Sequence, residues 1–467
     1  MRCHQESLVI PRGRNVETSL LRHPSTAFSL PRFPLVGHLP WFLADRLGFL
    51  EKWAQQGGEV ASLDIGRGTY LLTNPEDIKH VLVANPDNYE KSARMTSRRG
   101  REIAGEGLLT ASAEAHLKER KMLQPVFYRT VLARFSSVMT ASAGAQFDTW
   151  KPGMQINVAK EMEAVAQQVI IQALFGDDFQ DREGRLLVSI VRRQQYLAHV
   201  FFSVNPMAQY LPPWTWWRYR QAMRHIHTTI ARELRLRREG RSHGSDLLSM
   251  LMEARYEDGT GMTDQRIQNE VMILLITGYE SLVDGMAWMF HLLSESPEVA
   301  RKLAAEVDEA LEGRCPCADD IWKLPYASMV LAETLRLYPP SWIMVRHARS
   351  KDVLPSGVRV SEGARLYLCQ YVMHRHPLYY PDPERFDPSR FTDDAKKGRP
   401  QFAYFPFGGG ARVCIGEHFA KLEAILVLAM AVQRFTFHPV AGRPVVPEPR
   451  MTLRPKDGLP LRVEGRR

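Results

Sequence analysis

The amino-acid sequence predicts a protein that is mainly α-helical with small β-sheets. Helical periodicity is the commonest pattern, and it covers residues 113–238, 264–294 and 416–434. Short alternating segments typical of strands occur near the N-terminal end and again after Pro339-Pro340. Because no break in composition divides the chain, we expect a single domain over residues 31–467, preceded by an irregular extension over residues 1–30.

The first elements of the domain alternate between helix and strand. In order, we predict a helix from Ala44 to Gln56, a strand pair at Val60–Ile65 and Thr69–Leu72 joined by a glycine turn, and a helix over Pro75–Val83. Near the other end, a helix is predicted from Gly416 to Arg434, and the tail Met451–Val463 reads as a hairpin around a Pro-Lys-Asp-Gly turn.

The most prominent element is a long helix in the middle of the chain. Thr263 is a plausible N-cap, and the pattern runs to about Ser294, which corresponds to roughly 45 Å at about 1.5 Å per residue. Its middle, Val271–Ile276, is almost wholly apolar, so this helix is expected to cross the core. Glu280 and Asp284 within it argue against a membrane span.

Composition and charge limit the classes of function. Hydrophobic residues make up 45% and charged residues 24%, which is ordinary for a soluble globular protein. Because no secretory signal or transmembrane anchor is evident and the five cysteines form no disulfide framework, we expect a cytoplasmic protein. The net charge is +9, but Lys and Arg are dispersed without a basic-aromatic array, so a nucleic-acid partner is not expected.

The segment Phe407–Gly416 carries the strongest chemical signal. Three successive glycines precede Cys414, and a helical pattern begins just after it. Glycines permit unusual backbone angles and close approach, and the following helix N-terminus should favour a thiolate at Cys414. Two alternatives are a buried structural cysteine and a zinc site through Cys414 and His418, although the latter lacks a second ligand pair.

This segment resembles the haem-binding loop of the cytochrome P450 family, F-x-x-G-x-R-x-C-x-G. The resemblance implies that Cys414 is the axial ligand of a haem b iron and that Phe407 and Gly416 belong to the cofactor-binding loop. It also implies the triangular-prism fold of the family, with the haem between the long central helix and the Cys-loop helix. The implied activity is a monooxygenase that uses O2.

Two further segments resemble motifs of the same family in the same order. Glu333 and Arg336 match the E-x-x-R helix, and Arg390 matches the arginine of the F-x-P-x-R-F segment. The resemblance implies that these three residues form a buried charge triad with a structural role beneath the haem. Loss of one member of such a buried group is expected to cost about 3–5 kcal/mol.

The long helix contains the sequence Thr-Gly-Tyr-Glu-Ser, which resembles the A/G-G-x-D/E-T motif of the family. Gly278 should relax the helix, and Glu280 and Ser281 supply an acid and an alcohol that can deliver protons to bound dioxygen. Serine stands where threonine is usual, and it lacks the methyl group that restricts the rotamer. We therefore expect proton delivery to survive with more leakage to peroxide.

Several cations match positions that bind the haem propionates in the family. His116 and Arg120 lie at i and i+4 of a helical H-x-x-x-R segment, and Arg346 and Arg412 match two further positions. An exposed salt-bridge face is the alternative for His116 and Arg120.

Nearby cations also suggest how electrons arrive. Lys118, Lys121 and Arg129 add positive charge to the His116–Arg120 region. If this region lies on the cysteine side of the haem, it would attract an acidic ferredoxin or flavodoxin by electrostatic steering. No flavin or ferredoxin domain is recognisable in the chain, so we expect electrons to come from a separate donor and its reductase. The protein itself is expected to be a monomer.

The substrate is the least determined feature. By resemblance, the pocket is lined from residues 97–109, 196–210, 273–278 and 342–345, which are mostly apolar. A hydrophobic small molecule is therefore expected, such as a fatty acid, a terpene or a polyketide, with hydroxylation or epoxidation as the reaction. The aromatic segment 211–217, with Trp214 and Trp217, could be a substrate mouth, a membrane-dipping patch or loop packing.

Two other readings of the same sequence stay open. One is a peroxide-driven haem enzyme or an isomerase on the same fold, although Glu280 favours a monooxygenase. The other is a haem-binding protein without catalysis.

Overall fold

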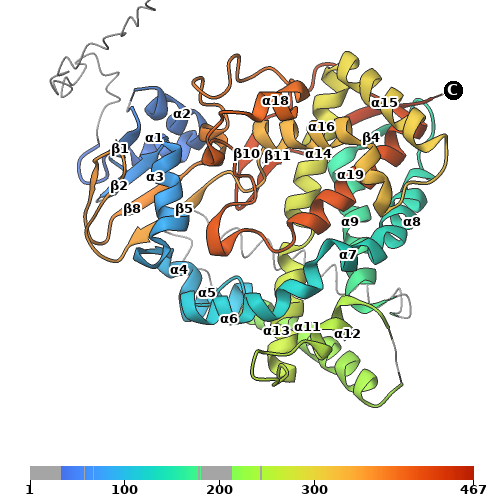
Figure 1. The fold of residues 1–467 in the computed structure, drawn as a ribbon, viewed down its shortest axis with the longest axis horizontal. Coiled ribbons are helices and arrows are strands. Elements are labelled where there is room, and N and C mark those ends of the chain that lie inside the picture. Colours follow the sequence, from blue (N-terminus) through green and yellow to red (C-terminus); the bar gives the residue numbers. More distant parts are fainter. Residues whose placement is uncertain are drawn as a thin grey trace, which may run out of the picture.

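Helices form most of the molecule, and the largest sheet lies at one side of it (Figure 1). The computed structural model describes residues 33–466 apart from 57, 67, 177–178, 180–212 and 242–243. The helices of the described residues are α1 (Leu39–Ala44), α2 (Arg46–Gln56), α3 (Pro75–Lys79), α4 (Ala93–Thr96), α5 (Arg98–Ala104), α6 (Ala113–Leu123), α7 (Arg129–Leu132), α8 (Ser136–Phe147), α9 (Val158–Phe175), α11 (Pro213–Arg238), α12 (Leu247–Glu253), α13 (Asp264–Thr277), α14 (Glu280–Glu295), α15 (Pro297–Leu311), α16 (Pro325–Leu337), α17 (Gln370–Met373), α18 (Asp393–Lys396) and α19 (Glu417–Arg434).

The strands form small sheets, as the sequence predicts. They are β1 (Val60–Leu63), β2 (Thr69–Leu72), β3 (Tyr89–Lys91), β4 (Gln155–Asn157), β5 (Met344–Ala348), β6 (Asp352–Val353), β7 (Arg359–Val360), β8 (Arg365–Leu368), β9 (Phe435–Pro439), β10 (Pro447–Pro449), β11 (Leu453–Pro455) and β12 (Pro460–Gly465). The largest sheet has the order β1-β2-β8-β5-β3, in which only β2 and β8 run parallel. Its order brings β3, from the first hundred residues, beside β5, which begins some 250 residues later.

The N-terminal predictions hold with one change. The strand pair β1–β2 and the helix α3 lie where the sequence places them, and α3 continues into a short π-helix over His80–Ala84. The expected helix from Ala44 to Gln56 is α2, and the short helix α1, which the sequence analysis does not predict, ends just before it at Ala44. The Asp45 carboxylate accepts a hydrogen bond from the Gly48 N–H at 3.0 Å, so it caps the second helix and ends the first.

The prediction of one uninterrupted long helix is wrong at one point. Thr263 caps its start as expected, because its hydroxyl accepts a hydrogen bond from the Arg266 N–H. However, α13 ends at Thr277 and α14 begins at Glu280, so Gly278 and Tyr279 separate two helices. The interruption lies within the motif that the sequence analysis assigns to proton delivery.

The predicted hairpin in the tail is also wrong. The strand β11 pairs with β10, whereas β12 pairs with β4 and β9 in a three-stranded sheet. The Leu459 N–H donates to the Asn157 side chain at 3.0 Å, which directs the chain toward β4 after the turn. The turn residues are therefore as expected, but the two strands they connect belong to different sheets.

Most of the hydrophobic core lies among the helices. One large cluster joins α8, α9, α13, α14, α16 and α19, and two smaller clusters cover the two faces of the five-stranded sheet. Within the described residues, Asp264–Glu295 is long and apolar enough to cross a membrane, but 72% of its most apolar window is buried inside the protein. It is therefore packed as a core helix, as the sequence analysis predicts.

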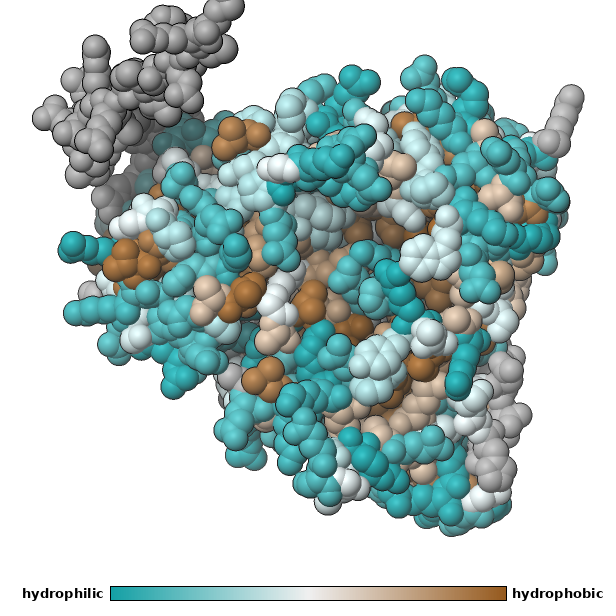
Figure 2. Space-filling view, viewed as in Figure 1, coloured by the Kyte–Doolittle hydropathy of each residue, from teal (hydrophilic) through white to brown (hydrophobic). Residues whose placement is uncertain are grey.

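The outer surface differs from this interior. Hydrophilic residues dominate the periphery of the face shown in Figure 2, and hydrophobic residues gather toward its middle. Trp214 and Trp217, near the start of α11, are 65% and 58% exposed. Residues 196–210 of the predicted pocket lie outside the described residues, as does Cys3. Cys315 and Cys317 are free and exposed, as expected for unlinked thiols.

Candidate active site

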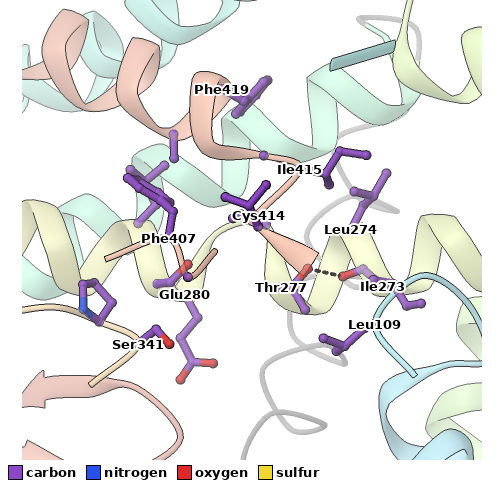
Figure 3. Close-up of a pocket in the computed structure, with 18 of the residues that line it drawn as sticks. Leu109, Ile273, Leu274, Thr277, Glu280, Ser341, Phe407, Cys414, Ile415 and Phe419 are labelled. Carbon is purple, nitrogen blue, oxygen red and sulfur yellow. Dashed lines mark hydrogen bonds between the residues drawn. The ribbon is translucent and has the colours of Figure 1, made fainter. Parts of the chain in front are cut away.

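A cavity of about 470 Å³ lies between the broken long helix and the loop that carries Cys414 (Figure 3). Thr277 and Glu280 come from the helix side, whereas Phe407, Cys414 and Ile415 come from the loop. Most of the lining is apolar, with leucine, isoleucine, methionine and phenylalanine side chains from both sides, and charged and hydroxyl-bearing side chains make up the rest. The cavity can therefore hold a large hydrophobic group next to a thiol.

The glycines of the Cys loop act largely through contacts with the protein itself. Gly408 and Gly410 have φ angles of +78° and +67°, which disfavour residues with side chains. A Cβ on Gly410 would lie 2.0 Å from the Leu82 carbonyl oxygen, and one on Gly409 would lie 2.4 Å from the Phe402 ring. The loop is thus fitted closely against the segment after α3, and this fit fixes the position of the cysteine that follows.

Cys414 faces the cavity at the end of this loop. Its N–H donates to the Phe407 carbonyl at 3.0 Å, and its side chain is accessible only where the cavity meets it. Burial raises the pKa of the Cys414 thiol, although the Gly416 N–H and the Arg120 guanidinium act in the opposite direction. The Gly416 N–H therefore acts in the expected direction, but burial opposes it.

A buried ion pair beneath the loop involves two of the predicted structural residues. Glu333 and Arg336 on α16 are fully buried, and the guanidinium contacts both carboxylate oxygens, at 2.6 and 2.7 Å. Arg390 lies 3.5 Å from the same carboxylate, and the Asp387 N–H donates to it at 2.9 Å. The structure therefore brings together all three residues of the predicted triad.

The triad is connected to the Cys loop through a residue that the sequence analysis missed. Arg336 donates a hydrogen bond to the His374 carbonyl at 3.0 Å, and the His374 ring accepts one from the Phe405 N–H at 2.9 Å. Burial, and then Arg336, lower the pKa of His374 to about 3, so its ring is neutral and can accept this bond. Nothing in the sequence near His374 marks it, because the contact depends on the packing of α16 against α17.

Cations gather at one end of the cavity. Lys91, His116, Arg120 and Arg412 line it, and Arg346 lies behind them on β5. The guanidinium and ammonium groups donate hydrogen bonds to main-chain carbonyls, at 2.8 Å for Lys91, 2.6 Å for Arg120, 3.1 Å for Arg346 and 3.0 Å for Arg412. No carboxylate among the described residues forms an ion pair with them, and one nitrogen of Arg412 is buried without a partner.

This arrangement is electrostatically unfavourable in the protein alone. Burial and the neighbouring Arg412 lower the pKa of Arg346 to about 10, and burial and the surrounding cations lower that of His116 to about 3. Burial, then Arg412 and Arg346, lower the pKa of Lys91 to about 7. Such a cluster requires an anionic ligand with at least one carboxylate-like group.

Lys91 is the member of this cluster that sequence reasoning missed. It lies at the end of β3, where its register partner on β5 is Arg346. The pairing of two strands so far apart in the chain brings the two cations together. A lysine in a short strand carries no signal of this kind in the sequence itself.

The helix break lies opposite the cysteine. Gly278 has an ordinary helical φ, but a Cβ there would lie 2.4 Å from the Leu274 carbonyl oxygen and 3.1 Å from Ile170 on α9. Next to the break, the Thr277 hydroxyl donates to the Ile273 carbonyl at 2.7 Å (Figure 3). Glu280 and Ser281 follow as the first residues of α14, and both line the cavity.

Glu280 is also in contact with the chain beyond the helix. The Thr452 hydroxyl, next to β11, donates a hydrogen bond to the Glu280 carboxylate at 3.4 Å. Thr452 itself lines the cavity and is buried. The sequence analysis does not name Thr452, because its approach to α14 follows from tertiary packing.

The alternative zinc site has no support among the described residues. They contain no group of three or more His, Cys, Asp or Glu side chains that could hold a metal ion. His418 instead accepts a hydrogen bond from Arg129 at 3.4 Å. The residues present fit a different metal-containing group. A thiol faces an apolar cavity, and one end of this cavity is lined by cations that have no acidic partner among the described residues and could bind carboxylates. A haem matches these three features with its iron, its apolar ring and its propionates, so fold and site together define a haem-thiolate protein.

Comparisons with known proteins agree with this class. The sequence model of the family described as Cytochrome P450 matches residues 29–461. The chain is 33% identical to the cyclooctat-9-en-7-ol 5-monooxygenase of Streptomyces melanosporofaciens over 88% of this chain and 89% of that protein. It is 32% identical to the pentalenene oxygenase of Streptomyces avermitilis over 88% of this chain and 92% of that protein. The crystal structure of the cytochrome P450DA heme domain superposes with a TM-score of 0.83 at 26% identity, over 94% of this chain and 97% of that one.

The chain belongs to the cytochrome P450 family. It is a monooxygenase that binds haem b, uses O2 and inserts one oxygen atom into a hydrophobic small molecule, with electrons from redox partners. The predicted fold class, cofactor and reaction class are thereby confirmed, and the non-catalytic haem protein is excluded.

Proposed function

We propose that this protein hydroxylates or epoxidises a cyclic hydrocarbon of the terpene type, with Cys414 as the axial ligand of the haem iron. The cavity between the Cys loop and the broken helix is the observation that carries the proposal, because it places a thiol, an apolar space and an acid-alcohol pair together. When bound, the haem iron supplies the activation of dioxygen. The relatives named for cyclooctat-9-en-7-ol and pentalenene support the substrate class.

The loop residues around Cys414 hold the sulfur in place. The Phe407 carbonyl accepts the Cys414 N–H, and the Gly416 N–H favours negative charge on the sulfur. Glu333, Arg336 and Arg390 serve a structural role, because they fix the chain beneath this loop through His374. None of the three lines the cavity among its described residues, which supports a positioning role.

The cation cluster binds the two haem propionates. His116, Arg120, Arg346 and Arg412 are the residues expected from the sequence, and the geometry adds Lys91. The cations already donate to carbonyls, but Arg412 retains a buried N–H without a partner among the described residues. Bidentate contacts of arginine with carboxylate would neutralise the repulsion within the cluster.

Glu280 and Ser281 handle protons at the dioxygen site. Gly278 ends α13, so that the next turn presents an acid and a hydroxyl to the cavity rather than to the helix backbone. Ser281 is accessible from the cavity, and without the methyl group of threonine its hydroxyl can take more than one orientation. This chemistry needs an acid that is protonated again after each donation, because two protons are consumed in each cycle.

The electron donor is proposed to be a separate ferredoxin or flavodoxin with its reductase, acting on a cytoplasmic monomer. The helix α6 lies beside the Cys loop, since Arg120 donates to the Val413 carbonyl. The exposed Arg129 side chain also lies beside this loop, because it donates to His418, four residues after Cys414, whereas the Lys118 ammonium lies over the Tyr256 ring. Lys121 forms an ion pair with Glu257 at 2.9 Å, which removes part of its charge from the patch.

Spectroscopy tests the central assignment. The reduced, carbon monoxide-bound protein should give the spectrum typical of thiolate ligation, and Cys414→His should give one typical of histidine ligation. A Cys315→Ser variant is the matched control, because this exposed thiol lies away from the cavity. A histidine-type spectrum from the unaltered protein would contradict the assignment.

Turnover separates the oxygen-driven reaction from the peroxide-driven alternative. With pentalenene as the probe, we expect product with NADPH, a plant-type ferredoxin and its reductase, and much less with hydrogen peroxide alone. Equal product under both conditions would favour the peroxide-driven enzyme.

A further inference from the structure

Asp284 is a buried carboxyl that the sequence analysis used only as an argument against a membrane span. It lies on α14 one turn after Glu280 and is 6% exposed. One of its oxygens, Oδ2, has no hydrogen-bond partner. It does not line the cavity, so it lies behind Glu280 as seen from the haem site. A buried carboxyl in this position needs an explanation, because burial of an unpaired charge is strongly unfavourable.

The helix and a neighbouring strand hold Asp284 in a defined place. Glu280, Asp284 and Trp288 follow each other at intervals of four residues and therefore share one face of α14. This face packs against the chain at β11: Thr452 donates to Glu280 at 3.4 Å, and the Trp288 ring N–H donates to the Leu453 carbonyl at 2.9 Å. Asp284 lies between these two contacts and is thus held next to Thr452.

The surroundings favour the protonated form of Asp284. Burial, and then the charge of Glu280, raise the pKa of Asp284 well above its usual value, and Glu163 on α9 acts in the same direction. A hydrogen bond with the Thr452 hydroxyl and the charge of Arg454 oppose this rise without cancelling it. These effects together favour the protonated form of Asp284, which can act as a proton donor.

The strand β11, which follows Thr452, carries an arginine that is partly exposed to solvent. The Arg454 side chain is 35% exposed, and it forms an ion pair at 3.0 Å with Glu448, which is 25% exposed. The hydroxyl of Thr452 reaches both carboxyl groups of α14. The cluster therefore has an inner end at the cavity, formed by Glu280, and an outer end near water, formed by Arg454 and Glu448.

We propose that Asp284 is a second proton-holding carboxyl that re-supplies Glu280 through the hydroxyl of Thr452. In this step the O–H bond of Asp284 breaks as its proton passes to the Thr452 oxygen, and the original hydroxyl proton forms an O–H bond with the Glu280 carboxylate. No electrons are transferred. Asp284 then regains a proton from water at the Arg454 side. The inference rests on the proposed role of Glu280 as the acid of the oxygen site.

The test compares peroxide released per NADPH consumed by the haem-bound enzyme. Electrons come from a plant-type ferredoxin and its reductase, and pentalenene is the probe hydrocarbon. We expect Asp284→Asn to raise the peroxide fraction several-fold, because Glu280 is then recharged too slowly. Glu423→Gln is the matched control: it neutralises another fully buried carboxyl, on α19, whose pKa burial also raises. Glu423 does not line the cavity, so no rise is expected there.

A second pair of variants keeps the test decisive if Asp284→Asn does not fold. Thr452→Val removes the hydroxyl with little change of shape, and Thr452→Ser keeps it. We expect more peroxide from Thr452→Val than from Thr452→Ser. Equal peroxide from these two variants, or an unchanged peroxide fraction in a folded Asp284→Asn protein, would overturn the inference.

Glu280→Gln distinguishes this failure from a failure of the proposed function. If it raises the peroxide fraction while Asp284→Asn does not, Glu280 is the acid and Asp284 is not its supplier. If Glu280→Gln also has no effect, the proposed role of Glu280 is wrong and the inference fails with it.

Infrared spectroscopy gives a readout that does not depend on turnover. The difference spectrum between the unaltered protein and Asp284→Asn should contain the carbonyl band of a protonated carboxylic acid. This band should shift in deuterated water faster than the band lost in Glu423→Gln, because the proposed re-supply exchanges the Asp284 proton with water. The absence of the band, or equally slow exchange at both sites, would contradict the inference.

Discussion

At the scale of single residues, the site is organised by charges that the protein alone does not satisfy. Lys91, Arg346 and Arg412 repel one another, and each is bound only to main-chain carbonyls among the described residues. Binding of a group with two carboxylates removes this repulsion, so the protein is built to gain stability from its cofactor. Lys91 is the informative member, because its pKa of about 7 lies in the range where proteins are studied.

We predict that haem affinity, taken relative to that of Lys91→Met, falls as the pH rises above about 7. In the haem-free protein Lys91 loses its proton near this pH, whereas the propionates should raise its pKa in the complex. Lys91 therefore takes up a proton on binding above pH 7, whereas the Cys414 thiol gives up its proton in both proteins, so the ratio of the two affinities isolates the contribution of Lys91. His116, with a pKa of about 3 in the haem-free protein, is neutral throughout the range. Spectroscopic titration of the haem-free protein between pH 6.5 and 9 measures the slope.

Lys91→Met should bind haem more weakly than the unaltered protein at pH 6.5, and the difference between the two should shrink as the pH rises. Lys118→Met is the control, because Lys118 is exposed on α6 and its ammonium lies over the Tyr256 ring. A slope in Lys91→Met equal to that of the unaltered protein would show that another group titrates.

At the scale of elements, short motifs gave reliable positions, but their mutual contacts depend on packing. The glycine loop, the E-x-x-R helix and the acid-alcohol segment were all found from the sequence, since each has its own pattern. The break between α13 and α14 was missed because the apolar periodicity continues across Gly278. The contact of α14 with β11 could not be predicted either, because it joins segments some 170 residues apart.

The ion pair of α16 allows a prediction at this scale. Arg336→Ala should lower the free energy of unfolding by about 3–5 kcal/mol, because it leaves the Glu333 carboxylate buried without its main partner. Burial already raises the pKa of Glu333, so the remaining Arg390 contact at 3.5 Å cannot compensate. Urea unfolding of the haem-free protein measures the loss.

Lys396→Ala is the control for this experiment. It breaks a pair with Asp393 at 2.8 Å in which both side chains are largely exposed, and such pairs contribute about 0–1 kcal/mol. If Arg336→Ala were no more harmful than this change, the ion pair would not fix the loop.

At the scale of the whole molecule, the sequence was sufficient for the fold class and insufficient for the sheets. Local periodicity predicts helices well, so the helical half of Figure 1 was expected. Strand partners are set by long-range pairing, which explains why the tail was read as a hairpin although β11 and β12 belong to different sheets. Lys91 could not be recognised as a site residue for the same reason, because its place in the site follows from the long-range pairing of β3 with β5.

The distribution of charge over the whole molecule leads to a prediction about electron delivery. The net charge is +9, and the exposed Arg129 side chain lies beside the Cys loop, where it donates to His418. An acidic donor would be steered to this side, and salt screens such attraction beyond a Debye length of about 10 Å at 0.1 M. We expect the rate of reduction by a plant-type ferredoxin to fall steadily as KCl is raised. Arg129→Glu should lower the rate at low salt and flatten its salt dependence, whereas Arg359→Glu, at an exposed position on β7, should change neither. Reduction at a rate independent of salt, or equal effects of the two substitutions, would show that the donor docks elsewhere.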